Sequence, residues 1–131
     1  MSAVLLDTTV LIDLLRGRSG ALKRLRSLRH ANDAPYACAV NVEEIVRGLR
    51  TREEAAAQQL FRGLRVAPLG VDEGWRAGEW RRSFAARGQT LTQADCLIAA
   101  AAFALDGRLA TGNSKQFPMR GLAVEHWPSG E

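Results

Sequence analysis

Short apolar segments alternate along the chain with longer segments whose apolar residues recur at helical spacing, and this alternation limits the possible folds most strongly. The predicted strands are 3–7, 35–39, 64–68, 108–111 and 122–126, and the predicted helices are 9–16, 19–30, 41–50, 53–63, 71–87 and 92–106. Because helices separate nearly all of the strands, a parallel sheet is favoured. We therefore expect an α/β fold, with a mostly parallel central sheet of about four to five strands flanked by helices.

The length and the cysteines indicate one domain in a reducing compartment. A chain of 131 residues can bury a core without disulfides, so we expect a single domain over residues 1–131, with 128–131 as a frayed tail. Cys38 and Cys96 form no CxxC pair and lie among apolar residues, which is typical of buried thiols. The longest apolar run, residues 96–105, is too short to span a membrane, and no signal peptide precedes Asp7. These features predict a cytoplasmic protein without a membrane partner.

The charge balance is basic. The sequence has 18 Lys and Arg residues against 14 Asp and Glu residues, for a net charge of +4. Such a surplus favours a polyanionic partner. The basic residues gather in 16–29, 47–52 and 81–87, but leucines recur at helical spacing in the first of these segments, which also fits the solvated face of an ordinary amphipathic helix. Only the overall sign of the charge therefore argues for nucleic acid.

Four polar residues share one kind of position, at the junction of an apolar run with a turn or a helix start: Asp7, Glu44, Asp95 and Asn113. Asp7 closes the predicted strand 3–7, and Asn113 follows the predicted strand 108–111 after a glycine. The two other acids each lie three residues after a possible helix cap, Asn41 before Glu44 and Thr92 before Asp95. This pattern places both acids in the first turn of a helix.

These positions predict a common site. In an open parallel sheet the carboxyl ends of the strands and the starts of the following helices face one crevice. Carboxylates gathered there repel one another unless a cation neutralises them, and an all-oxygen set suits Mg²⁺ or Mn²⁺ better than zinc. Each residue also has a plain structural explanation, because an acid after a cap stabilises a helix and an asparagine after glycine forms turns. Their recurrence at equivalent places favours the metal site.

Other chemistries find less support in the sequence. It contains no GxSxG, HExxH, P-loop or GxGxxG motif, and we interpret His30 and His126 as structural or surface residues. Trp75, Trp80 and Phe84 lie in one predicted helix, where core or subunit packing is favoured over stacking on bases. An aspartyl phosphotransferase that uses Asp7 remains an alternative, but such enzymes carry a second aspartate where this chain has a threonine.

Four segments in this order resemble the PIN-domain ribonucleases, and among them the VapC-type toxins of bacterial toxin–antitoxin pairs. They are LLDTTVLID at 5–13, NVEEIVRG at 41–48, DCLIAA at 95–100 and LATGN at 109–113. The resemblance implies a single PIN-like domain in which Asp7, Glu44 and Asp95 hold Mg²⁺ or Mn²⁺ for RNA cleavage. Glu44 is chosen over Glu43 because the acid of the family is followed by an aliphatic residue and, four positions on, by glycine.

The chain departs from its apparent relatives at two positions. Many of them have an acid where this chain has Asn113, and many carry another just before the residue matching Phe117, where this chain has Gln116. An amide can still ligate a hard cation or bind its water, but it adds no charge to hold a second ion. We therefore expect Asn113 as a fourth ligand of one firmly held metal.

The resemblance also implies the function and the partners. It implies a Mg²⁺-dependent endoribonuclease toxin that acts on RNA through a metal-activated water, a small VapB-like antitoxin as its cognate partner, and a homodimer. The alternative is a non-catalytic PIN-like module that binds RNA or a partner chain.

Overall fold

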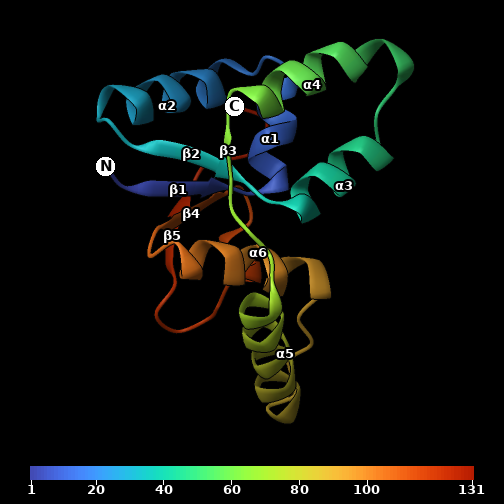
Figure 1. The fold of residues 1–131 in the computed structure, drawn as a ribbon, viewed down its shortest axis with the longest axis vertical. Coiled ribbons are helices and arrows are strands. Elements are labelled where there is room, and N and C mark those ends of the chain that lie inside the picture. The colour runs from blue at the N-terminus through green and yellow to red at the C-terminus, as the bar shows by residue number, and fades with distance from the viewer.

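The central sheet has five strands, all parallel, in the order β3-β2-β1-β4-β5 (Figure 1). The structure is a computed structural model that describes residues 1–131. The strands are β1 (Ala3–Leu6), β2 (Ala34–Ala37), β3 (Arg65–Val66), β4 (Arg108–Thr111) and β5 (Ala123–His126). The α/β prediction of a sheet with about five strands is confirmed.

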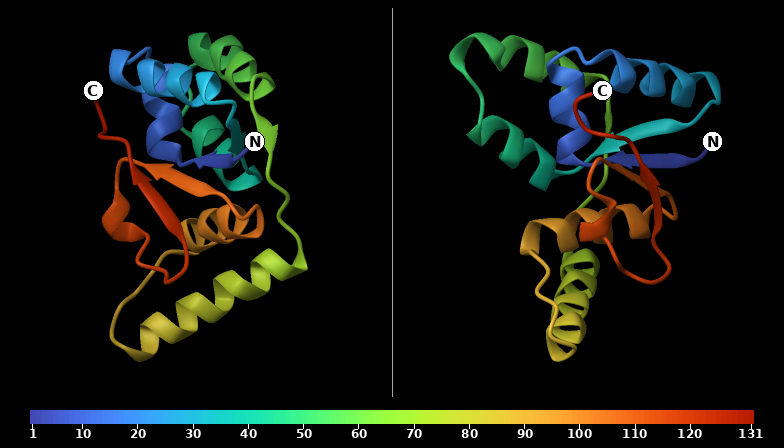
Figure 2. Two further views of the ribbon diagram at one scale, coloured as in Figure 1. Left: turned by 90° about the vertical axis from the view of Figure 1, so that its left-hand side faces the viewer. Right: turned by 180° about the vertical axis from the view of Figure 1, so that it is seen from behind.

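Helices cover both faces of this sheet. They are α1 (Thr8–Leu15), α2 (Ser19–His30), α3 (Ala39–Arg47), α4 (Glu54–Arg62), α5 (Val71–Ala86) and α6 (Gln93–Ala104), and two 3-10 turns, η1 (Thr51–Glu53) and η2 (Ser114–Gln116), complete the set. In Figures 1 and 2, α1, α2 and α4 lie on one side of the sheet, whereas α6 packs on the other and α5 lies beyond it. None of the helices is both long and apolar enough to cross a membrane.

The strands alternate their side chains between two cores. Val4 and Leu6 of β1 pack with α1 and α2, whereas Leu5 faces the core formed with α6. On the adjacent strand β4, Leu109 joins the α6 side and Ala110 the α1 side. Successive side chains of these strands point to opposite faces of the sheet, and both faces are buried. The strand segments are therefore continuously apolar.

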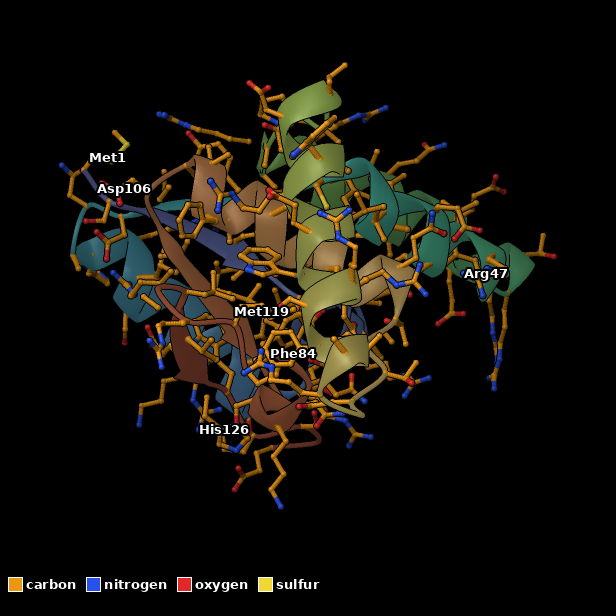
Figure 3. The ribbon with its side chains drawn as sticks, turned by 90° about the horizontal axis from the view of Figure 1, so that it is seen from below. Met1, Arg47, Phe84, Asp106, Met119 and His126 are labelled. Carbon is orange, nitrogen blue, oxygen red and sulfur yellow. The ribbon has the colours of Figure 1, made fainter.

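Small residues let α6 pack closely on the sheet. Its alanines from Ala99 to Ala102 are all buried, and Ile98 is buried beside them. In the view onto α5, Phe84 and Met119 lie near each other in this core, while Arg47 projects at the margin of the molecule (Figure 3). Trp80 packs edge-to-face on Phe103, with ring centroids 5.9 Å apart.

Several local predictions are confirmed, and one is confirmed only in part. Cys38 and Cys96 are free and buried, and both histidines lie at the surface. Core packing is confirmed for Phe84 and Trp80, whereas Trp75 is 70% exposed and packs in neither core, so that subunit packing stays a prediction for Trp75. Trp75 is one of the exposed large apolar residues of the protein.

Helix α3 begins earlier than the sequence predicts. It starts at Ala39 with Cys38 as its N-cap, and Asn41 is its third residue. The prediction that Asn41 caps the helix and that Glu44 lies in its first turn is therefore wrong, since Glu44 falls in the second turn. The same pattern is correct in α6, where Thr92 is the N-cap and its hydroxyl accepts a hydrogen bond from the Asp95 backbone N–H.

The last residues lie against the start of the chain's helical region. The Gly130 N–H donates to Asp13 Oδ2 at 2.9 Å, and the Ala21 N–H donates to the Glu131 backbone oxygen at 3.3 Å. Fraying of residues 128–131 stays a prediction.

Candidate functional site

The site lies at the carboxyl ends of β1 and β4, two adjacent strands in the middle of the sheet. Leu6 at the end of β1 is in register with Ala110 of β4, and the backbone N–H of Asp7 donates to the Ala110 carbonyl at 2.8 Å. Asp7 is also the N-cap residue of α1. Its carboxylate therefore stands where a helix begins, and the positive end of the helix dipole favours its negative charge.

Threonine hydroxyls hold one oxygen of Asp7. Asp7 Oδ2 accepts a hydrogen bond from Thr111 Oγ1 at 2.7 Å and another from Thr9 Oγ1 at 3.1 Å. The Gly112 N–H donates in turn to Thr9 Oγ1 at 2.9 Å. Asp7 is only 5% exposed, and its other oxygen, Oδ1, has no hydrogen-bond donor within the fold. A buried carboxylate with one free oxygen can accept an external ligand.

Glu44 joins the site through Thr8, the residue after Asp7. Thr8 Oγ1 donates to Glu44 Oε1 at 2.7 Å. The neighbouring Glu43 lies on another side of α3, where it is exposed and forms a salt bridge with Arg47 at 2.7 Å. Of the two glutamates, Glu44 is therefore the one beside the Asp7 segment.

Asp95 faces the same group from the first turn of α6. Burial raises the pKa of the Asp95 carboxyl, a hydrogen bond with Thr92 lowers it, and the negative charges of Asp7 and Glu44 raise it further. The same two charges add to the effect of burial in raising the pKa of the Cys38 thiol. Asp7 and Glu44 therefore lie within electrostatic reach of Asp95, and a metal site shared by the three acids stays a prediction.

No basic side chain neutralises these three acids. The salt bridges of the protein join Arg47 to Glu43 and Arg108 to Asp33 and Glu125, and none includes Asp7, Glu44 or Asp95. The result is a partly buried concentration of negative charge made only of oxygen ligands, which fits a hard divalent cation such as Mg²⁺ or Mn²⁺. No three His, Cys, Asp or Glu side chains are close enough to form a ready-made metal cluster.

Asn113 is connected to the site by its backbone. Its N–H donates to Thr111 Oγ1 at 3.0 Å, whereas its side chain is exposed and forms no hydrogen bond. Gln116, in η2, is also exposed. The structure thus places Asp7, Glu44 and Asp95 on elements that meet near the carboxyl end of β1, with only the main chain of Asn113 tied into the hydrogen bonds around Asp7.

Sequence reasoning missed two of the polar side chains that support the acids. Thr9 binds Asp7, and Asn41, assigned only as a cap, donates to Thr8 Oγ1 at 3.0 Å. The doublet of Thr8 and Thr9 directly after a strand-end aspartate is the signal that was available for Thr9. Nothing local marks the contact of Asn41, because it joins residues 33 positions apart.

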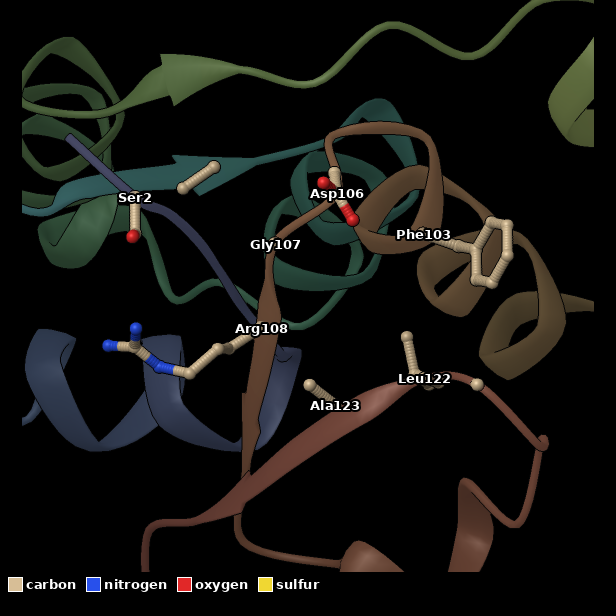
Figure 4. A pocket seen from close by; sticks show the side chains of 9 residues that line it. Ser2, Phe103, Asp106, Gly107, Arg108, Leu122 and Ala123 are labelled. Atoms are coloured by element: carbon tan, nitrogen blue, oxygen red, sulfur yellow. The ribbon is translucent and has the colours of Figure 1, made fainter.

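A pocket of about 360 Å³ lies at the opposite end of the sheet. Ser2, Gly107 and Ala123 line it at the amino ends of β1, β4 and β5, together with Phe103 and Asp106 (Figure 4). Arg108 on its wall is already paired with Asp33 at 3.1 Å and Glu125 at 2.9 Å. This pocket therefore has no part in the acidic site.

Comparison with known proteins agrees with this architecture. Residues 4–120 match the model of the PIN domain family. The chain is 37% identical over 117 residues to Ribonuclease VapC10 of Mycobacterium tuberculosis, covering 88% of this chain and 86% of that protein. It is 30% identical over 115 residues to Ribonuclease VapC19 of the same organism, covering 88% and 92% of the two chains.

Solved structures show the same fold. The structure of VapBC2 from Rickettsia felis, bound to a DNA fragment from its promoter, contains a chain that superimposes with a TM-score of 0.85 at 20% identity, over 95% of this chain and 98% of that one. The match to the family model spans all four predicted site positions, from Asp7 to Asn113. The chain belongs to the PIN domain family and, within it, to the VapC group.

Proposed function

We propose that the protein is a divalent-metal-dependent endoribonuclease that acts as the toxin of a toxin–antitoxin pair. The observation that carries the proposal is the group formed by Asp7, Glu44 and Asp95, three carboxylates without a basic partner at the carboxyl edge of the sheet. Its relatives in the family are named ribonucleases, which supports RNA as the substrate. The basic net charge of +4 suits a polyanion.

Each residue of the site would have its own role in the reaction. We assign Asp7, through its free Oδ1, and Asp95 as direct ligands of a Mg²⁺ or Mn²⁺ ion, with Asn113 as a weaker fourth ligand. Bound there, the ion would lower the pKa of a water molecule and offset the charge of the phosphate. Glu44, held by Thr8, would position that water for in-line attack on an RNA phosphodiester. Thr9 and Thr111 keep the Asp7 carboxylate in one orientation.

The test of this function is metal-dependent cleavage with defined product ends. Metal-free protein is incubated with a pool of structured RNAs, first with EDTA and then with Mg²⁺ or Mn²⁺. We expect cleavage only with the metal, and products with 5′-phosphate and 3′-hydroxyl ends. Cleavage that continues in EDTA, or products with cyclic phosphates, would contradict a metal-activated water as the nucleophile.

A second candidate is a module that binds RNA or a partner without cleaving it. Asn113 and Gln116 favour it, because they stand where many relatives carry acids that add to the charge of the site. This candidate predicts that RNA is retarded in a gel in the presence of Mg²⁺ and recovered intact.

We also propose a small VapB-like antitoxin as the partner, since similar chains occur in VapBC complexes. An apolar groove of about 490 Å³ lies between α3, α4 and β3, lined by Val42, Val46, Phe61 and Val66. Val46 is 55% exposed there, on the same helix as Glu44. A partner in this groove would act next to the site. We expect Val46→Asp to weaken co-purification with the antitoxin, whereas the control Arg52→Ala, at an exposed position outside the groove, should not.

The family resemblance further suggests a homodimer. Light scattering of the purified chain would measure this, and a monomeric mass at micromolar concentration would contradict it.

A further inference from the structure

Asn41 is the one fully buried amide of the site region. Its side chain is 0% exposed, although amides are seldom buried without a specific partner. Both ends of this amide are used. Oδ1 accepts the backbone N–H of Cys38 at 2.9 Å, and Nδ2 donates to Thr8 Oγ1 at 3.0 Å. The first hydrogen bond caps α3, whereas the second connects α3 to Thr8, the first residue of α1.

These hydrogen bonds can run in only one direction. A backbone N–H is a donor, so the oxygen of Asn41 must face Cys38 and its NH₂ group must face Thr8. Thr8 Oγ1 therefore accepts a hydrogen bond from Asn41 and donates its own hydroxyl hydrogen to Glu44 Oε1, 2.7 Å away. This series of hydrogen bonds ends at the Glu44 carboxylate, which can only accept hydrogen bonds. Each bond in it fixes the orientation of the next.

The direction of these hydrogen bonds also explains why position 41 carries an asparagine. A helix start of this kind ordinarily carries a glutamate or glutamine at the third position, where it receives the N-cap N–H. An aspartate in place of Asn41 would accept from Cys38 equally well, but its second oxygen could not donate to Thr8. The Thr8 proton would then have two competing acceptors, the introduced carboxylate and Glu44. An amide avoids this conflict.

We propose that Asn41 is a positioning residue for Glu44. By fixing the Thr8 hydroxyl as a donor, it holds Glu44 Oε1 and leaves Oε2 as the oxygen available to the metal or to its water. Asn41 itself touches neither. This role rests on the proposed function, because it gives Glu44 a purpose only if the acidic site takes a divalent ion.

The expected effect is a loss of metal affinity. Supporting hydrogen bonds around metal ligands typically change metal affinity by about 10–100-fold when they are removed. Since Asn41 acts two bonds away from the carboxylate, we expect about a tenfold weaker Mn²⁺ dissociation constant for Asn41→Leu. Thr8→Val, which removes the hydroxyl but keeps the shape, should have the same effect, and Thr8→Ser should restore affinity to within about twofold.

The experiment is a double-mutant cycle on Mn²⁺ binding by calorimetry, using the metal-free full chain. Asn41→Leu is measured in the wild-type background and in Glu44→Gln. If Asn41 acts through Glu44, its substitution adds less than about twofold in the second background. An equal loss in both backgrounds would assign Asn41 a purely structural role, and an unchanged affinity in both would likewise overturn the proposal.

Two further arms keep the result interpretable. If Asn41→Leu does not fold, the Thr8→Val and Thr8→Ser pair in the same two backgrounds decides by the same criterion. If the wild-type chain binds no Mn²⁺, the proposed function fails, and the role of Asn41 fails with it. If wild type binds Mn²⁺ and cleaves RNA while both Asn41→Leu and Thr8→Val bind as tightly, only the role of Asn41 is overturned.

Discussion

The surroundings of Asp95 raise the pKa of its carboxyl group, and the stability of the metal-free protein should therefore depend on pH. Its pKa is raised in the folded state, mainly by burial and further by the charges of Asp7 and Glu44. A raised carboxyl pKa means that the folded state binds more protons than the unfolded state. Stability should therefore fall as pH rises from the usual aspartate range through the raised pKa of Asp95.

Removing this charge should stabilise the metal-free chain at neutral pH. We expect Asp95→Asn to raise the free energy of unfolding at pH 7, and the gain to disappear below the usual pKa range of aspartate, where Asp95 is protonated in both states. Urea unfolding in EDTA across a pH series measures this. A variant that is less stable than wild type at pH 7 would contradict a net destabilising effect of the Asp95 charge.

Substitutions of Asn113 test whether a further negative charge strengthens metal binding at the site. The side chain is exposed, so an added carboxylate would act through water, where attraction at 4 Å amounts to about 1 kcal/mol per unit charge. We expect Asn113→Asp to bind Mn²⁺ at least about fivefold more tightly, while Asn113→Ala changes the affinity by less than about twofold. A loss in Asn113→Ala as large as that of Asp95→Asn would make Asn113 a principal ligand.

At the scale of elements, two local patterns with the same spacing gave one correct and one incorrect prediction. Thr92 and Asp95 mark the start of α6 as predicted, but Asn41 and Glu44 do not mark the start of α3. The spacing of three residues fits Cys38 with Asn41 equally well, and a cysteine is not an expected cap. Hydrogen bonding of the Val42 N–H to the Cys38 carbonyl extends the helix one turn earlier. Local sequence cannot choose between such overlapping caps.

Helix α6 is the element that both carries Asp95 and fills the core below the sheet. Ile98, in the middle of this helix, is only 1% exposed. We expect Ile98→Ala to lower the free energy of unfolding by about 2–5 kcal/mol, through lost burial and the cavity that remains. Val71→Ala on the outer surface of α5 is the matched control, and should change it by less than about 0.5 kcal/mol. Equal effects in a urea titration would contradict the assigned core.

For the whole molecule, the alternation of strands and helices was enough to predict the parallel sheet and the edge at which Asp7 lies, whereas a metal site shared by Asp7, Glu44 and Asp95 stays a prediction. The rule that strand ends and helix starts share one crevice does not depend on side-chain detail. The hydrogen bonds that orient the acids could not be predicted in this way. Thr111 and Asp7 are 104 positions apart, and their 2.7 Å contact depends on the register of β4 against β1.

The most direct test of the account is RNA cleavage by matched variants of the site. Wild type, Asp7→Asn, Asp95→Asn and the control Glu43→Gln are compared at equal concentration in Mg²⁺, after circular dichroism has established that each is folded. We predict that both aspartate variants lose about 100-fold or more in cleavage rate, beyond the range typical of supporting residues, and that Glu43→Gln stays within about twofold of wild type. Undiminished cleavage by both Asp7→Asn and Asp95→Asn would contradict the metal site as the centre of activity.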